Sequence, residues 1–210
     1  VRGHFGQAAD IYRSRHLSAA HLARWLRADL PARILDSYAL KTASGIEALA
    51  DAACALARSP AAVRTACTAF ARAFGVAFQI MDDVENFTQP LRAARAADDD
   101  IAAGKLTYVS MRALMALPPG QRRQLARIIC TPGLRAGSGP RRTAHALVRS
   151  SGALESCRDE AWRMMERAWD ALAPRLPRPA PRALLHTLCA SLLTLRDTRV
   201  SCRASARPVR

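Results

Sequence analysis

The sequence has few aromatic residues and almost no lysine. Aromatic residues make up 5% of the chain, whereas hydrophobic residues make up 50% and are dominated by Ala and Leu, which favour helix over strand. A chain of 210 residues is long enough to bury a core without disulfide or metal support. We therefore predict an all-α helical bundle, with one domain over residues 1–200 and a basic, disordered tail over 201–210.

The sequence also lacks paired cysteines and long apolar runs. No CxxC pair or His cluster occurs, so neither a zinc site nor a disulfide framework is indicated. The longest apolar run, 183–195, is too short for a membrane span and is interrupted by His186 and Thr187. No charged-then-apolar leader is evident at the start of the sequence. We expect a cytoplasmic protein that is not embedded in a membrane.

The formal net charge of +15 raises the question of nucleic-acid binding. The excess is C-terminal: residues 1–100 hold 12 basic and 11 acidic residues, and residues 101–210 hold 20 and 6. The basic residues are almost all Arg, spread singly or in pairs, without the interleaved aromatics that a base-stacking surface requires. We therefore expect no nucleic-acid partner.

Proline residues divide the sequence into segments with helical spacing of apolar residues. Helices are predicted near 5–29, 33–58, 61–88, 101–117, 120–130, 141–150, 153–173 and 182–198. The composition of 131–140, TPGLRAGSGP, predicts a surface loop. That of 174–181, PRLPRPAP, predicts a stiff connector, and we expect the tail after Val200 to be frayed.

Two stripes of side chains are predicted on the 61–88 helix. A 4-3-4-3 spacing aligns an apolar set that we expect in the core: Phe70, Phe74, Ala77, Met81 and Val84. A polar set lies roughly opposite: Gly75, Gln79, Asp82 and Asn86, with Asp83 beside it. Two carboxylates and two amides therefore share one face of the helix.

Adjacent acids on a helix are most often solvated, and that explanation stays open here. Against it, Asp82 and Asp83 repel one another in the middle of an apolar helix, where Asp is a poor helix former. Hard oxygen ligands that converge on one spot suit Mg²⁺, which typically takes one or two carboxylates together with water and phosphate oxygens. We therefore expect Gln79, Asp82 and Asp83 to hold magnesium together with phosphate oxygens of a ligand.

A second acidic run, Asp98–Asp100, is followed by the segment Gly104–Tyr108. Asp100 precedes Ile101 and suits the N-cap of the next helix. This role and a metal-facing role are compatible, because a cap can also orient a side chain toward an ion.

The chain has only two lysines, Lys41 and Lys105. In a chain where Arg is the usual cation, a compact ammonium suggests a point contact to phosphate. Lys41 is followed by Thr42 and lies near Gly45, and these small residues allow close approach of a ligand or helix. The alternative is that both lysines are ordinary surface residues.

Four segments together resemble the C-terminal half of a trans-isoprenyl diphosphate synthase, a member of the polyprenyl synthetase family. They are GQAAD (6–10), YALKTASG (38–45), GVAFQIMDDVENF (75–87) and DDDIAAGKLTY (98–108). The resemblance covers roughly residues 3–117 and implies a bundle of the isoprenoid (terpenoid) synthase type. It also implies a prenyltransferase in which Mg²⁺ and lysines stabilise a departing diphosphate while isopentenyl diphosphate attacks the allylic cation.

By this resemblance the metal ligands are Asp82, Asp83 and Asn86. Catalytic roles go to Lys41, Lys105 and Gln79, and the substrate-binding residues are Lys41, Thr42, Gln79, Lys105, Gln7 and Asp10. Asn86 stands where the family has Asp, and Val109 stands where it usually has Pro. The partners implied are isoprenoid diphosphates and a homo- or heterodimer partner.

The family's first aspartate-rich motif, DDxxD or DDxxxxD, does not occur in the sequence. We therefore expect a prenyl-synthase-like chain that lacks the N-terminal helices, whose own activity is open and which aggregates without a partner. Two alternatives remain: a non-catalytic regulatory or binding subunit of a prenyl synthase heteromer, and a class I terpene cyclase. The second alternative requires an NDxxSxxxE-like triad, which the sequence does not contain.

Overall fold

The computed structural model describes residues 1–27, 29–88, 100–176 and 178–196. Within these ranges all regular structure is helical and no strand occurs. The helices are α1 (Arg2–Arg15), α2 (Ala19–Arg27), α3 (Leu30–Tyr38), a π-helix (Ala39–Ala43), α4 (Ser44–Leu56), α5 (Ala61–Thr88), α6 (Asp100–Ala103), α7 (Tyr108–Ala116), α8 (Pro119–Cys130), α9 (Pro132–Ala136), α10 (Ser138–Ser150), α11 (Ala153–Leu172), a short 3₁₀ turn (Ala173–Arg175) and α12 (Pro179–Arg196). The prediction of an all-α fold is confirmed.

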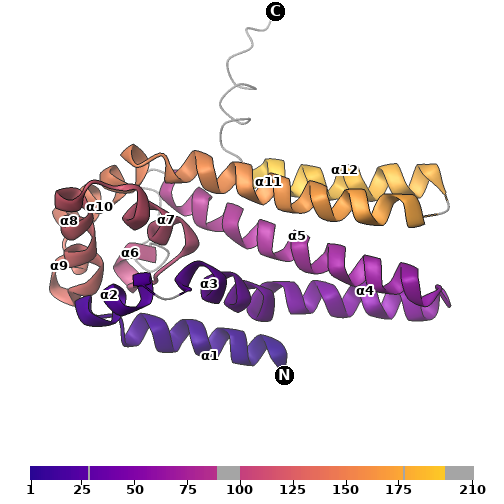
Figure 1. The fold of residues 1–210 in the computed structure, drawn as a ribbon, viewed down its shortest axis with the longest axis horizontal. Coiled ribbons are helices and arrows are strands. Elements are labelled where there is room, and N and C mark those ends of the chain that lie inside the picture. The colour runs from indigo at the N-terminus through magenta and orange to yellow at the C-terminus, as the bar shows by residue number, and fades with distance from the viewer. Residues whose placement is uncertain (28, 89–99, 177, 197–210) are drawn as a thin grey trace, which may run out of the picture.

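The long helices lie side by side along the molecule (Figure 1). α5 is the central element, and it packs against α4 on one side and against α11 on the other. α12 also contacts α5, while α1 lies against the π-helix. The short helices α2 and α6–α10 gather at one end of the long ones (Figure 1). The polar residues of α5 predicted for the site, within 79–86, lie toward its C-terminal end, near these short helices (Figure 1).

The apolar stripe predicted for α5 forms the middle of the core. All five of its residues are buried, and Ala77, Met81 and Val84 are completely inaccessible to solvent. The boundaries of α5 also match the predicted helix, 61–88. None of the helices in the described ranges combines the length and the hydropathy that a membrane span requires.

The predicted helix 5–29 is divided into α1 and α2, and this part of the prediction is wrong. α1 ends at Arg15, and α2 begins at Ala19. The backbone N–H of His21 donates to the Ser18 hydroxyl at 3.2 Å, so Ser18 acts as an N-cap that starts a new helix. The predicted helix 33–58 begins three residues early, at Leu30, and contains the π-helical turn Ala39–Ala43.

The predicted helix 101–117 is also divided, into α6 and α7. Gly104 adopts a positive φ of 69°, which ends α6, and the Thr107 hydroxyl accepts a hydrogen bond from the Ser110 N–H to start α7. Positive φ suits glycine because it has no Cβ. The division leaves residues 104–107 as a loop that carries Lys105 into the site.

The predicted loop over 131–140 is wrong, because the segment forms α9 and the first turn of α10. Pro132 is the first residue of α9, and Pro140 lies in the first turn of α10. Proline is tolerated at both places because the first N–H groups of a helix have no intrahelical acceptor. The predicted connector 174–181 is shorter than expected, since α12 begins at Pro179. Asp98, Asp99 and the tail 201–210 lie outside the described residues.

Candidate active site

The last third of α5 presents its polar residues toward a cleft. Asp83 is 4% exposed, whereas Gln79 and Asp82 are partly exposed. The Gln79 amide donates to the Asp82 carboxylate at 3.3 Å, which orients one side chain against the other. The Gln79 carbonyl in turn accepts a hydrogen bond of 2.7 Å from the Thr42 hydroxyl of the π-helix. Asp83 is therefore not a solvated surface residue, and Asp82 is partly exposed within the cleft.

Asp83 connects three helices at the bottom of the cleft. Its carboxylate accepts hydrogen bonds from the Tyr38 hydroxyl at the end of α3 and from the Tyr108 N–H at the start of α7, the latter at 3.2 Å. The Tyr108 N–H also lies 2.9 Å from the Tyr38 oxygen. The Tyr108 hydroxyl extends the other way and donates to Glu160 of α11 at 2.8 Å. α3, α5, α7 and α11 are thereby joined through polar contacts.

Each lysine of the chain forms an ion pair at the cleft. Lys41 of the π-helix lies 3.1 Å from the carboxylate of Asp10 on α1, and Lys105 lies 2.8 Å from the carboxylate of Asp100 at the start of α6. The Asp100 backbone N–H donates to the Asn86 side-chain oxygen at 3.3 Å, which connects this segment to α5. The two ammonium groups, 64 positions apart in the sequence, therefore meet at one site.

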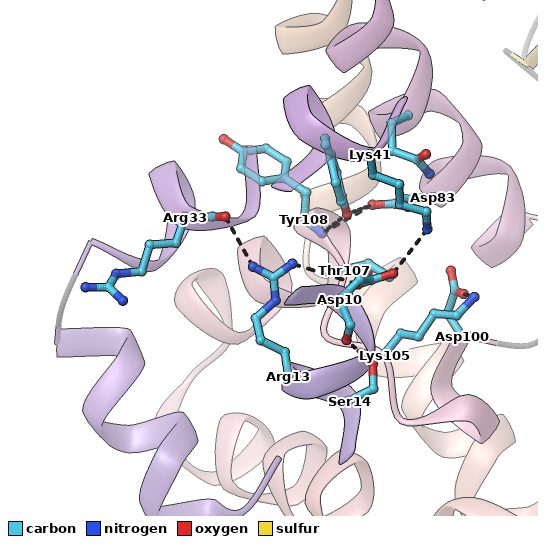
Figure 2. Close-up of polar contacts among 12 residues, drawn as sticks. Asp10, Arg13, Ser14, Arg33, Lys41, Asp83, Asp100, Lys105, Thr107 and Tyr108 are labelled. Carbon is cyan, nitrogen blue, oxygen red and sulfur yellow. Dashed lines mark hydrogen bonds and ion pairs between the residues drawn. The ribbon is translucent and has the colours of Figure 1, made fainter. Parts of the chain in front are cut away.

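The cleft has a volume of about 260 Å³. Its lining includes four carboxylates and two ammonium groups that come from α1, the π-helix, α5 and the 100–107 segment: Asp10, Asp82, Asp83, Asp100, Lys41 and Lys105, together with Tyr38, Gln79, Leu106 and Thr107. Figure 2 shows Asp10, Lys41, Asp83, Asp100 and Lys105 gathered around this space. Mixed charges of this density in a small concave site suit a polar, highly charged ligand.

Carboxyl groups are concentrated at the bottom of the cleft. Burial, followed by the negative charge of Asp100, raises the pKa of the Asp83 carboxyl well above its usual range, although the Tyr38 hydrogen bond opposes this. Burial also raises the pKa of the Asp100 carboxyl, against the hydrogen bond and charge of Lys105. For Lys105, burial lowers the ammonium pKa, but the contact with Asp100 outweighs it and the net shift is upward. A divalent cation would relieve the repulsion among these acids.

The residues predicted for the site fall into three groups. Asp10, Lys41, Gln79, Asp82, Asp83 and Lys105 line the cleft. Thr42 and Asn86 do not line the cleft, but each bonds to a residue that does: Thr42 to Gln79, and Asn86 to Asp100. Gln7 is an exposed residue of α1 that is not part of the lining. Among the described residues, no group of three or more His, Cys, Asp or Glu side chains is arranged so that it could hold a metal ion.

Four lining residues were not predicted as site residues: Tyr38, Asp100, Leu106 and Thr107. For Asp100 the sequence left both an N-cap role and a metal-facing role open, and Tyr38 was not singled out. One signal was available for Tyr38: it lies three positions before Lys41, a spacing that puts two side chains on the same face of a helix. Nothing in the sequence around Tyr38 indicates its hydrogen bond to Asp83, which lies 45 residues away.

Comparisons with known proteins agree with the fold and the motifs. The sequence profile of the family described as "Polyprenyl synthetase" matches residues 2–135. An all-trans-nonaprenyl-diphosphate synthase (geranyl-diphosphate specific) from Rhodobacter capsulatus is 35% identical over 104 residues, which is 49% of this chain and 31% of that protein.

Two solved structures are also similar. A polyprenyl synthase from Caulobacter crescentus CB15, complexed with calcium and isoprenyl diphosphate, superposes with a TM-score of 0.68 and 25% identity, over 89% of this chain and 58% of that one. A geranylgeranyl pyrophosphate synthase from Corynebacterium glutamicum, complexed with isoprenyl diphosphate and magnesium, superposes with a TM-score of 0.71 and 21% identity, over 91% of this chain and 52% of that one. The chain thus spans a little over half the length of these solved proteins.

Proposed function

The chain belongs to the polyprenyl synthetase family and has its all-α fold, and on this premise we propose that its cleft binds the diphosphate of an allylic isoprenoid through Mg²⁺. One observation supports this most strongly. The only two lysines of an Arg-rich chain both line the cleft, opposite the acids of α5. A diphosphate needs cations around it, and a compact ammonium is a good point contact for phosphate oxygens.

The acids of the cleft fit a magnesium ion. Mg²⁺ is usually held by one or two carboxylates and completes its octahedron with water and phosphate oxygens, so a ready-made cage of protein ligands is not required. Asp82 and Asp83 would hold the ion, with Asn86 behind them as a neutral oxygen donor. Bound Mg²⁺ would neutralise the diphosphate and make it a better leaving group.

The side chains of the cleft have separate roles in this proposal. Lys41 and Lys105 contact the diphosphate and stabilise the charge that develops as it departs. Gln79, fixed by Thr42 and Asp82, orients the substrate. Asp10 and Asp100 hold the two ammonium groups in place until the diphosphate arrives.

The reaction that this arrangement serves is head-to-tail condensation with isopentenyl diphosphate. The allylic carbon–oxygen bond breaks and the diphosphate leaves with the electron pair. The double bond of isopentenyl diphosphate then attacks the allylic cation and a carbon–carbon bond forms. The new cation loses a proton to the departed diphosphate, and a double bond forms. Because the chain spans little more than half the length of its solved relatives, we propose binding for this chain and condensation for the complete catalytic assembly.

Titration calorimetry with geranyl diphosphate tests the proposal. We expect binding that depends on Mg²⁺, and we expect Asp82→Ala to weaken it by roughly tenfold or more. Asp170→Ala is the matched control, because it removes the same charge from an exposed position of α11 and should bind like the wild type. Equal binding by the wild type and Asp82→Ala would refute the assignment.

An activity measurement separates catalysis from binding alone. Product formation from geranyl and isopentenyl diphosphates by the chain alone would show that this chain contains a full active site. Magnesium-dependent binding without product would instead favour a binding subunit that works with a complete synthase. The alternative of a class I terpene cyclase predicts diphosphate release from geranyl diphosphate in the absence of isopentenyl diphosphate.

A further inference from the structure

The π-helix Ala39–Ala43 carries two of the residues that meet at the cleft, Lys41 and Thr42. A π-helical turn is rare and less favourable than an α-helical one, because it accommodates an extra residue within the turn. Such a turn persists only where the surrounding packing determines it. The elements that contact the π-helix should therefore show what holds it in place.

α1 contacts the π-helix through Gly6. This glycine is buried, and a Cβ placed on it would lie 2.7 Å from the Lys41 Cα and 2.8 Å from the Leu40 carbonyl carbon. Both are backbone atoms, which cannot move aside as the end of a flexible side chain can. Only glycine allows α1 to approach the π-helix this closely.

α5 contacts the same turn through Gly75. A Cβ on Gly75 would lie 2.6 Å from the Cα of Ala43 and 2.7 Å from its Cβ. Ala43 is completely buried, so it has no space into which to move. The π-helix is therefore in direct backbone contact with two helices, and at each contact the neighbouring helix has a glycine.

Each glycine lies one helical turn before a residue that bonds to the π-helix. Asp10 follows Gly6 by four residues and pairs with Lys41 at 3.1 Å, and Gln79 follows Gly75 by four residues and accepts from Thr42 at 2.7 Å. Residues four apart lie on the same face of a helix. The close approach at each glycine thus brings the next polar side chain on that face within bonding distance of the π-helix.

We propose that Gly6 and Gly75 are positioning residues, which allow α1 and α5 to fix the π-helix so that Lys41 and Thr42 are directed to the diphosphate. They act through Lys41 and Thr42 and do not touch the substrate themselves. The binding part of this inference rests on the proposed function. The structural part, that the two glycines hold the π-helix, does not depend on it.

The chain provides a matched control for each glycine. Gly3 lies on α1 one turn before Gly6, and a Cβ there would meet nothing nearer than 3.8 Å. Gly45 lies on α4 just after the π-helix, and a Cβ there would meet nothing within 4 Å. Gly3→Ala and Gly45→Ala should therefore behave like the wild type.

Hydrogen exchange of the whole chain, read by mass spectrometry, tests the structural part. In Gly6→Ala and in Gly75→Ala we expect exchange over residues 39–44 to quicken by about tenfold or more, while the rates in α8 and α11 stay unchanged. An increase spread evenly over all helices would overturn the proposal, because it would show a general loss of packing. Failure of these two variants to fold, when both controls fold, would overturn it for the same reason.

Calorimetry with geranyl diphosphate and Mg²⁺ tests the binding part. In the wild-type background we expect Lys41→Met to weaken binding by about tenfold. We expect Gly6→Ala alone to weaken binding by about tenfold as well. When Lys41→Met is added to Gly6→Ala, the further loss should be less than about twofold, because the lysine is then no longer held in position. Local loosening of 39–44 with unchanged affinity would overturn the positioning role. Absence of binding by the wild type, together with the expected exchange pattern, would refute the proposed function but leave the structural part supported.

Discussion

The hydroxyl of Tyr38 donates a hydrogen bond to the carboxylate of Asp83, and both side chains are buried. Tyr38 ends α3 and directly precedes the π-helix, whereas Asp83 lies on α5 beside Asp82. The Tyr38 oxygen also accepts the Tyr108 N–H at 2.9 Å. One phenol thus connects the helix that leads to Lys41, the acids of α5 and the helix that follows Lys105.

Replacement of Tyr38 by phenylalanine should lower the free energy of unfolding by about 1–3 kcal/mol, because the buried Asp83 carboxyl loses one of its two hydrogen-bond donors. Urea denaturation measures this change. Tyr12→Phe is the control, since Tyr12 is 61% exposed, and its stability should match that of the wild type. Equal stability of the two variants would show that the Tyr38 hydroxyl contributes nothing to the fold.

Replacement of Lys105 by methionine should destabilise the protein more near pH 7 than near pH 4. The Lys105 ammonium lowers the pKa of Asp100, although burial keeps that pKa above its ordinary value. A carboxyl whose pKa is raised by folding favours the folded state at low pH and loses that contribution as pH rises through the folded pKa. Without Lys105 this pKa rises further, so the loss at neutral pH grows.

Urea denaturation at the two pH values measures the difference for Lys105→Met. The control is Arg167→Met, which removes one positive charge from an exposed position on α11. This variant should lose similar stability at both pH values. A loss for Lys105→Met that does not depend on pH would show that the ammonium does not act on Asp100.

Cys157 should resist alkylation in the folded protein near pH 8. Its side chain is completely buried on α11, and burial raises the pKa of the thiol to about 12. The thiolate is the reactive form, and the folded state keeps the thiol protonated. Peptide mass spectrometry after iodoacetamide treatment should find Cys157 unmodified in the native protein and modified in guanidinium.

The raised pKa of the Cys157 thiol also makes the stability of the protein depend on pH in alkali. The folded-state pKa of Cys157 lies above the unfolded value, so the associated stability is fully present below about pH 8.5 and is lost as the pH rises toward 12. Rapid alkylation of the native protein near pH 8 would contradict the burial of this thiol.

The outer face of α4 should cause self-association. Leu49 and Leu56 are 73% and 87% exposed and lie seven residues apart, with the exposed small residues Ala52 and Ala53 between them. This apolar stripe resembles the faces through which helices pair. The apparent mass of the chain, measured by light scattering, should therefore increase with concentration.

The double substitution Leu49→Lys and Leu56→Lys should abolish this concentration dependence, because association would then remove two charged side chains from water. Both positions are exposed in the chain itself, so the helical content of the variant should be unchanged. Ala171→Lys is the control, because it places a lysine at an exposed position of α11 outside the stripe. A wild-type chain that stays monomeric at all concentrations would refute the prediction.

The sequence was most informative where one helix carried a regular pattern. The flanking prolines predicted the limits of α5. The spacing of its apolar residues, from Phe70 to Val84, predicted its buried face. The resemblance to prenyl synthases likewise assigned the family, which the sequence profile confirms. Local periodicity is sufficient in such a case because the helix is long and the core contacts it along one side.

The sequence was least informative where distant segments determine local structure. The π-helix depends on the approach of Gly6 and Gly75 from two other helices, and nothing in the segment 39–43 indicates an extra residue in the turn. The break after Gly104 and the helical start at Pro132 depend on capping, where a glycine or proline is compatible with either a loop or a helix end. The bond between Tyr38 and Asp83 joins residues that only the tertiary fold brings together.

The acids and the core residues of α5 lie on opposite sides of a single uninterrupted helix of 28 residues. An insertion or deletion of one residue before Gln79 would rotate everything after it by about 100° relative to what precedes it. Either the carboxylates would leave the cleft or the apolar stripe would leave the core. Evolution of this segment is therefore confined to substitutions, and changes in chain length must be accommodated in the connections between helices.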